Sequence, residues 1–136
     1  MKHLLFLCVA NSARSQIAEG IARQMFNGRA VVASAGSKPT IVNPFAIRVL
    51  AEIGISTAEH TSKSIDQVDV NAMDLVVTLC VDEVCPVVNS RVRKLHWPFP
   101  DPAQPGQSDA DGMREFRKVR DLIAAKLPEL KAILEG

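Results

Sequence analysis

The chain has 136 residues, of which 47% are hydrophobic, and a formal net charge of +1 at pH 7. Its length and composition predict a single domain over residues 1–136 with one packed core. The near-neutral charge offers no basic face for nucleic acid, and no apolar run approaches the roughly 18 residues of a membrane-spanning helix. The N-terminus lacks a signal-peptide layout, so we expect a cytoplasmic protein, in which cysteines are more often reactive than structural.

Strand-like and helix-like segments alternate along the chain. This order predicts an α/β fold, a three-layer sandwich in which a four-stranded parallel sheet has helices on both faces. Apolar runs predict buried strands at residues 3–7, 30–34, 74–79 and 92–97. Helical periodicity predicts helices at 15–27, 44–53 and 113–134, and a short helix or turn at 68–73. Pro128 should kink or split the last helix, and residues 98–112 should form the longest loop.

The most informative segment joins the first strand to the first helix. Cys8 ends the strand, and a five-residue loop precedes Arg14: Val9, Ala10, Asn11, Ser12 and Ala13. Inward loop amides, the positive end of the helix and the Arg14 guanidinium would together bind a tetrahedral oxyanion. The same groups would stabilise a Cys8 thiolate, so this spacing predicts nucleophilic attack on the bound oxyanion. A lone cysteine would instead be interpreted as a buried core residue.

Two polar residues are expected to support the loop. Ser15 can donate a hydrogen bond to the Cys8 thiolate, and we expect it also to cap the first helix. Asn11 tolerates a left-handed backbone and can bond the loop carbonyls.

Asp101 stands between Pro100 and Pro102, just after the fourth predicted strand. Ligands of open parallel sheets bind beyond the carboxyl ends of the strands, so we expect Cys8, Cys80 and Asp101 to share one edge. A carboxyl group held there could protonate a leaving oxygen. On its own, an aspartate in such a turn would be an ordinary solvated residue.

The sequence leaves three interpretations of Cys80 and Cys85. The two residues could be unrelated structural thiols. They could belong to a zinc site, which the scattered positions of the histidines disfavour. They could also form a relay that passes oxidation from the buried site toward the surface by thiol–disulfide exchange. In a regular helix the two residues would lie about 140° apart, too divergent for a disulfide. We therefore expect this segment to unwind when oxidised. The three histidines are interpreted as surface or core residues without a catalytic role.

From Cys8 to Gly20 the chain resembles the phosphate loop of the low-molecular-weight protein tyrosine phosphatases and of the arsenate reductases that share their fold. The resemblance extends over nearly the whole chain, through Ser34–Gly36, Asn43–Pro44, His60–Ser62, Asp74–Cys80, His96–Trp97 and Asp101–Pro102. The chain contains no tyrosine, whereas those phosphatases usually carry tyrosines beside their acid loop. Because Cys80 is followed shortly by Cys85-Pro86, the chain looks most like the thioredoxin-coupled arsenate reductases.

The resemblance implies an enzyme that reduces arsenate to arsenite, with side phosphatase activity. Cys8 would attack arsenate held by Arg14, and Asp101 would protonate the departing oxygen. Cys80 would then form a disulfide with Cys8, and Cys85 would convert it to a Cys80–Cys85 disulfide that thioredoxin reduces. A phosphomonoesterase is the alternative, and an oxyanion sensor whose disulfide signals to a partner is the third interpretation.

The expected ligands and partners follow from the same resemblance. The ligand would be arsenate, with phosphate or sulfate as analogues, and the protein partner would be thioredoxin. We expect a monomer that needs no nucleic acid, membrane or obligatory cofactor. Some members hold a potassium ion near the loop, and the matching oxygen ligands here would be Asn11, Glu19, Ser34 and Asp66.

This sequence departs from the family pattern at three places. Ala10 stands where glycine is frequent, so a left-handed backbone there would be strained. Ala13 replaces a frequent cysteine, and the spacing from Cys80 to Cys85 is shorter than in several members.

Overall fold

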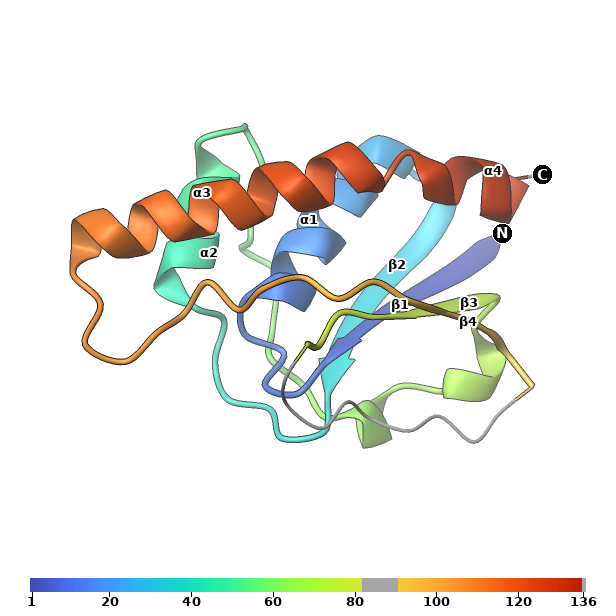
Figure 1. Ribbon diagram of the computed structural model, residues 1–136. Coiled ribbons are helices and arrows are strands. Elements are labelled where there is room, and N and C mark those ends of the chain that lie inside the picture. The colour runs from blue at the N-terminus through green and yellow to red at the C-terminus, as the bar shows by residue number, and fades with distance from the viewer. Residues whose placement is uncertain (82–90, 136) are drawn as a thin grey trace.

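One parallel sheet organises the protein. The structure, a computed structural model, describes residues 1–81 and 91–135. Within them, four strands lie in the order β2-β1-β3-β4 (Figure 1), and every pair is parallel. The strands are β1 (Lys2–Cys8), β2 (Ala30–Gly36), β3 (Leu75–Thr78) and β4 (Arg93–His96). The four predicted strands are therefore confirmed, with small shifts at their ends.

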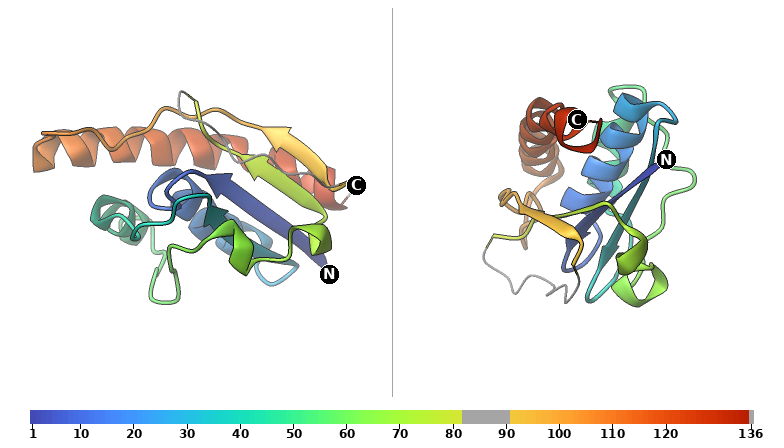
Figure 2. Two further views of the ribbon diagram at one scale, coloured as in Figure 1. Left: turned by 90° about the horizontal axis from the view of Figure 1, so that it is seen from below. Right: turned by 90° about the vertical axis from the view of Figure 1, so that its right-hand side faces the viewer.

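Helices cover both faces of this sheet, as predicted. In the described residues, the α-helices are α1 (Arg14–Phe26), α2 (Pro44–Ala51), α3 (Asp109–Lys126) and α4 (Glu129–Glu135). They gather on one side of the sheet, and two short 3₁₀ helices, Ile65–Gln67 and Val70–Ala72, lie on the other (Figure 2). None of the helices described has the length and apolar character needed to cross a membrane.

The sequence of β1 explains why both faces are covered. Leu4 and Phe6 pack into the large core with the α-helices. Leu5 and Leu7 point the opposite way and pack with residues around the 3₁₀ helices. All four side chains are fully buried, because successive residues of a strand face opposite sides of the sheet.

The C-terminal helical segment differs from the prediction at its start. Its first helix, α3, begins at Asp109 rather than at residue 113, because the Ser108 side chain accepts a hydrogen bond from the Asp111 N–H and caps it. The polar first turn carries no apolar stripe, so periodicity alone missed it. The break before α4 falls at Pro128, as expected for a residue without an N–H.

The strand order places Cys8 at a special position. From β1 the chain passes to β2 on one side of it and then crosses to β3 on the other side. In open parallel sheets such a reversal opens a crevice at the carboxyl end of the strands, where ligands bind. Cys8 is the last residue of β1 and therefore lies at that crevice.

Candidate active site

The loop after Cys8 is anchored through its carbonyl groups. The Val9, Ala10 and Ser12 carbonyls accept hydrogen bonds from the backbone N–H groups of Lys38, Thr40 and Asn43, respectively. The Asn11 carbonyl accepts one from the Gln16 side chain, at 3.0 Å. Four consecutive loop carbonyls are thus held by the surrounding segments.

This anchoring turns the loop amides toward a common centre. In a planar trans peptide the N–H points opposite to the C=O, and the described peptide bonds are all trans. The N–H groups of residues 10–13 therefore face away from the anchoring segments. The first turn of α1, which begins at Arg14 with no side-chain cap, adds its N-terminal N–H groups and positive dipole end. Backbone N–H groups arranged in this way can bind an anion, and we refer to this part of the loop as the anion nest.

A small cavity lies where these groups converge. Its volume is about 130 Å³, a size suited to one tetrahedral oxyanion rather than to a large ligand. The cavity is lined by Cys8, Ala10, Ser12, Ala13, Arg14, Thr40, Asp101 and Ala103.

Cys8 is a free thiol at the floor of this cavity. Its Sγ lies 2.9 Å from the Ser15 Oγ, and the Asn11 side-chain amide donates to that same hydroxyl at 2.8 Å. The Ser15 hydroxyl accepts from Asn11 and keeps its own hydrogen, which it can donate to the sulfur when Cys8 is a thiolate. Ser15 thus contacts Cys8 as expected, but it does not cap α1: Ala13 occupies the N-cap position without a side-chain hydrogen bond.

Arg14 is buried beside the cavity and held by the neighbouring strand ends. Its guanidinium donates to the carbonyls of Phe99, at 3.1 Å, and Leu79, at 3.4 Å. These bonds aim a planar fork of donors at the anion nest, which suits a phosphate-like ligand.

Asp101 also lines the cavity. Its carboxylate lies 3.8 Å from the Arg14 guanidinium and accepts a hydrogen bond from the Ala103 N–H. The side chain is 42% exposed, so it can exchange protons with water. An acid here can reach an oxygen of an anion attacked by Cys8.

Cys80 lies at the same edge of the sheet, just beyond the strand that neighbours β1. Leu7 pairs with Thr78, and the Leu79 N–H donates to the Leu7 carbonyl. Leu79 therefore lies opposite Cys8, and Cys80 is the next residue along the chain. Cys80 is fully buried and disulfide-bonded. Cys85 and the segment expected to unwind on oxidation lie outside the described residues.

Asn11 adopts the left-handed conformation predicted for it, with φ of 48°. Its side chain bonds not the loop carbonyls but Ser15, Ser34 and the Lys63 N–H. Ala10 has no positive φ, so the strain that its alanine would cause does not arise. The turn that the loop needs is made at Asn11 instead.

A buried polar network continues from the loop into the interior. The Ser34 hydroxyl accepts from Asn11 at 2.9 Å and donates to Glu19 at 2.7 Å. Glu19 is 1% exposed and also faces Arg23 at 3.3 Å and His60 at 3.5 Å. Hydrogen bonds thus connect the buried carboxylate of Glu19 to the Cys8 sulfur through Ser34, Asn11 and Ser15.

Sequence reasoning missed two members of this network. Gln16 donates to the Asn11 and Thr61 carbonyls and bonds His60 through its side-chain oxygen. His60, expected to be a surface or core residue, instead joins Gln16 to Glu19. Burial lowers the pKa of His60 below its ordinary value, although the adjacent Glu19 charge opposes the shift. The available signal was that Gln16 and Glu19 are polar residues at buried positions of a helix.

Of the four residues matched to a potassium site, the structure brings three together and leaves Asp66 apart from them. Asn11, Glu19 and Ser34 are linked by hydrogen bonds, and the Asn11 Oδ1 accepts from the Lys63 N–H. Asp66 is exposed, and in the part of the chain that the structure describes its carboxylate has no partner in this cluster. Lys63 lies in the cluster instead, with its Nζ 4.0 Å from a Glu19 oxygen.

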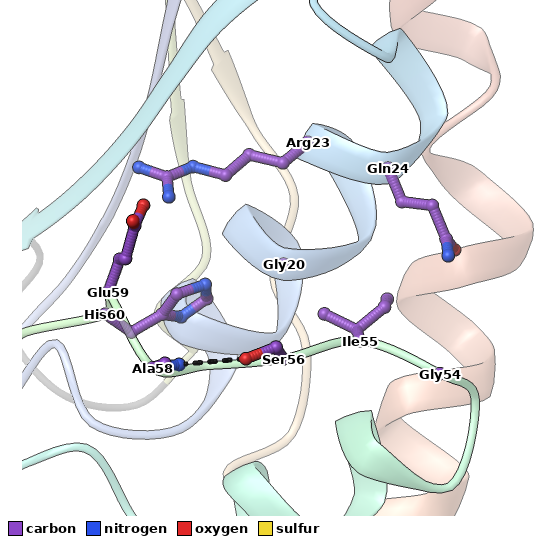
Figure 3. Close-up of a pocket in the computed structure, with 9 residues that line it drawn as sticks. All are labelled: Gly20, Arg23, Gln24, Gly54, Ile55, Ser56, Ala58, Glu59 and His60. Carbon is purple, nitrogen blue, oxygen red and sulfur yellow. Dashed lines mark hydrogen bonds between the residues drawn. The ribbon is translucent and has the colours of Figure 1, made fainter.

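A larger cavity, of about 490 Å³, lies on the far side of this network. Figure 3 shows His60 and Arg23 on its wall, with the Arg23 and Glu59 side chains turned toward one another. None of its lining residues is a cysteine. The nucleophile, the guanidinium and the acid all line the smaller cavity, which we identify as the candidate active site.

A cysteine, an arginine and a helix end around a small anion nest define a phosphatase-type phosphate loop. Residues 3–135 match the low molecular weight phosphotyrosine protein phosphatase family, and the chain belongs to that family. An arsenate reductase of Halalkalibacterium halodurans is 42% identical over 128 residues, which cover 93% of this chain and 92% of that protein.

Solved structures agree with this assignment. An arsenate reductase in the phosphate binding state superposes with a TM-score of 0.82 at 31% identity, covering 98% of this chain and 99% of that one. A thioredoxin-dependent arsenate reductase of Corynebacterium glutamicum superposes with a TM-score of 0.76 at 25% identity, covering 99% of this chain and 62% of that one.

Proposed function

We propose that the protein is a thioredoxin-dependent arsenate reductase. The observation that carries the proposal is the pairing of β1 with β3, which brings a second cysteine, Cys80, beside the nucleophile of a phosphate loop. A phosphatase needs only the loop cysteine, the arginine and the acid. A second thiol at this position serves a reaction that oxidises the first. The arsenate reductases among its relatives support the same assignment.

Binding and attack use groups of the small cavity. Arsenate is held by the loop N–H groups and by the Arg14 guanidinium, which stabilise its charge without reorganisation. The Cys8 thiolate, supported by the Ser15 hydroxyl, attacks arsenic. Asp101 gives a proton to the departing oxygen, which leaves as water. The product is a covalent Cys8–arsenic(V) adduct.

Reduction follows when Cys80 attacks the sulfur of Cys8. A Cys8–Cys80 disulfide forms, and the electron pair of the sulfur–arsenic bond passes to arsenic, which leaves as arsenite. Cys85 then attacks Cys80, which frees Cys8 and forms a Cys80–Cys85 disulfide. Thioredoxin supplies the two electrons that reduce it. A free Cys8 beside a disulfide-bonded Cys80 supports this order.

The remaining parts of the proposal concern the setting of the enzyme. We infer a monomer acting through one catalytic domain over residues 1–136, with phosphate and sulfate as competing analogues. A cytoplasmic location suits a relay that thioredoxin must keep reduced.

The decisive test replaces Cys80 with serine. In an assay with arsenate, thioredoxin, thioredoxin reductase and NADPH, the wild-type protein should oxidise NADPH only when arsenate is present. Cys80→Ser should lose this turnover, because arsenite cannot leave without the second thiol. Hydrolysis of para-nitrophenyl phosphate should persist, because it needs only Cys8, Arg14 and Asp101.

Other outcomes would assign a different function. Hydrolysis without arsenate-dependent NADPH oxidation in the wild-type protein would make it a phosphatase. Loss of both activities in Cys80→Ser would show that Cys80 supports the loop itself. Oxyanion binding with neither activity would favour the sensor interpretation.

Asp101→Asn should lower the hydrolysis of para-nitrophenyl phosphate by about 10²-fold or more, the usual contribution of a positioned acid. The amide keeps the shape of the side chain but holds no proton to give to a leaving oxygen. A stopped-time assay of kcat measures the effect. Asp109→Asn, at an exposed position in the first turn of α3, is the matched control and should be unaffected. Equal activity of the two variants would contradict the acid role.

A further inference from the structure

The buried carboxylate of Glu19 needs a positive partner. It is 1% exposed, and an ionised carboxylate removed from water is stable only when it is paired and hydrogen-bonded. The Ser34 hydroxyl supplies one hydrogen bond. Arg23 lies 3.3 Å from one carboxylate oxygen, and the Lys63 Nζ lies 4.0 Å from the other. Both charges come from the chain itself.

The backbone of Lys63 is held in place at this site. Its N–H donates to the Asn11 Oδ1 at 2.9 Å, and its carbonyl accepts from the Gly36 N–H at 2.9 Å. The Nζ donates to the Thr61 carbonyl at 3.4 Å, and the side chain is 23% exposed. Lys63 is therefore tied to the loop through Asn11 and to the buried carboxylate through its ammonium group.

The cluster of oxygens that a potassium ion would use already has a cation from the chain beside it. The Asn11 Oδ1 accepts from the backbone N–H of Lys63, so the amide nitrogen of Asn11 is the group turned toward Ser34. Both Glu19 oxygens face donors, and the ammonium of Lys63 would repel a second cation at this distance. A hard cation binds through several oxygen ligands, and the Lys63 ammonium lies against one Glu19 oxygen that it would have to share.

We propose that Lys63 is a positioning residue whose ammonium group takes the place of a bound potassium ion, and so holds the Glu19–Ser34–Asn11 support of the phosphate loop from within the chain. The protein then has no specific requirement for potassium. This inference concerns the support of the site proposed above, and it holds whichever oxyanion is turned over. Its test uses no substrate, so a negative result would leave the proposed reaction intact. Failure of the proposed reaction would likewise leave the role of Lys63 untouched.

The test is thermal unfolding of the wild-type protein in potassium, sodium and choline chlorides at one ionic strength of about 0.1 M. We expect the same Tm in all three salts. Lys63→Met keeps the length of the side chain and removes its charge. In choline chloride it should lower the Tm by at least about 3 °C, and potassium chloride should restore part of this loss.

Lys118→Met is the matched control, because Lys118 forms an ion pair with Glu115 at an exposed surface of α3. It should change the Tm little and should show no response to potassium. A rise in the wild-type Tm that only potassium produces would overturn the proposal. So would equal Tm values for the two variants in choline chloride, or a Lys63→Met Tm that potassium does not raise. The wild-type measurement decides even if Lys63→Met fails to fold.

Discussion

Cys8→Ser should lower both arsenate-dependent NADPH oxidation and para-nitrophenyl phosphate hydrolysis by at least about 10⁴-fold. The serine oxygen fits the space of the sulfur but does not ionise near neutral pH, so no nucleophile remains. The loop carbonyls stay anchored to residues 38–43, and Arg14 keeps its bonds to the Leu79 and Phe99 carbonyls. The anion nest should therefore survive the substitution.

Phosphate binding separates the loss of a nucleophile from the collapse of the loop. Calorimetric titration should show that Cys8→Ser binds phosphate as tightly as the wild-type protein, or more tightly, because a negative thiolate has been removed from the site. Binding weakened by tenfold or more would mean that Cys8 holds the loop in shape. Residual turnover above about 1% of wild type would mean that another group performs the attack.

Gly36→Ala should damage the site without touching any group that performs chemistry. Gly36 ends β2 opposite Cys8, and a Cβ atom there would lie 2.3 Å from the Val9 carbonyl oxygen and 2.9 Å from the Asn11 nitrogen. Backbone must move to relieve such contacts. We expect a loss of about 1–3 kcal/mol in the free energy of unfolding. We also expect about a 10²-fold fall in kcat/KM, the effect of a displacement near 1 Å.

Gly28→Ala provides the comparison for that experiment. Gly28 lies just beyond the C-terminal end of α1 with a φ of +83°, and a Cβ atom there would meet no other atom within 4 Å. Alanine at this position carries only the penalty of a left-handed backbone, about 1–2 kcal/mol, and should leave kcat/KM unchanged. Denaturant unfolding and steady-state kinetics measure both variants. If Gly36→Ala retains full activity, the close approach of β2 does not shape the loop.

The candidate site was largely predictable because its groups are close in sequence. Cys8, the loop and Arg14 form one strand–loop–helix unit, and the left-handed backbone at Asn11 followed from the residue type. The edge shared by Cys8, Cys80 and Asp101 followed from the rule for parallel strands. The break at Pro128 followed from the missing N–H.

The support behind the site was not predictable from local pattern. His60 and Lys63 are brought to the loop by turns and crossings of the chain, and the bonds that Gln16 makes to Thr61 and His60 depend on the same crossings. Ser15 was expected both to contact Cys8 and to cap the first helix; it lies against the Cys8 sulfur, but it does not cap α1. Asp66 was expected beside Glu19, and Lys63 lies there instead. Polar contacts between distant segments depend on distances of a few tenths of an ångström, which residue order does not convey.

By itself the sequence determined the class of fold and the loop between Cys8 and Arg14, because the first depends on the period of the hydrophobic residues and the second on short spacing. It also predicted Cys8 and Asp101 as the residues that attack and protonate a bound oxyanion. Only the tertiary structure decided which strand lies beside Cys8 and which cation lies beside Glu19. It also decided how Arg14 is aimed between the ends of β3 and the segment after β4. These are contacts between parts of the chain far apart in sequence, and they form only when the sheet order and the packing of the helices are complete.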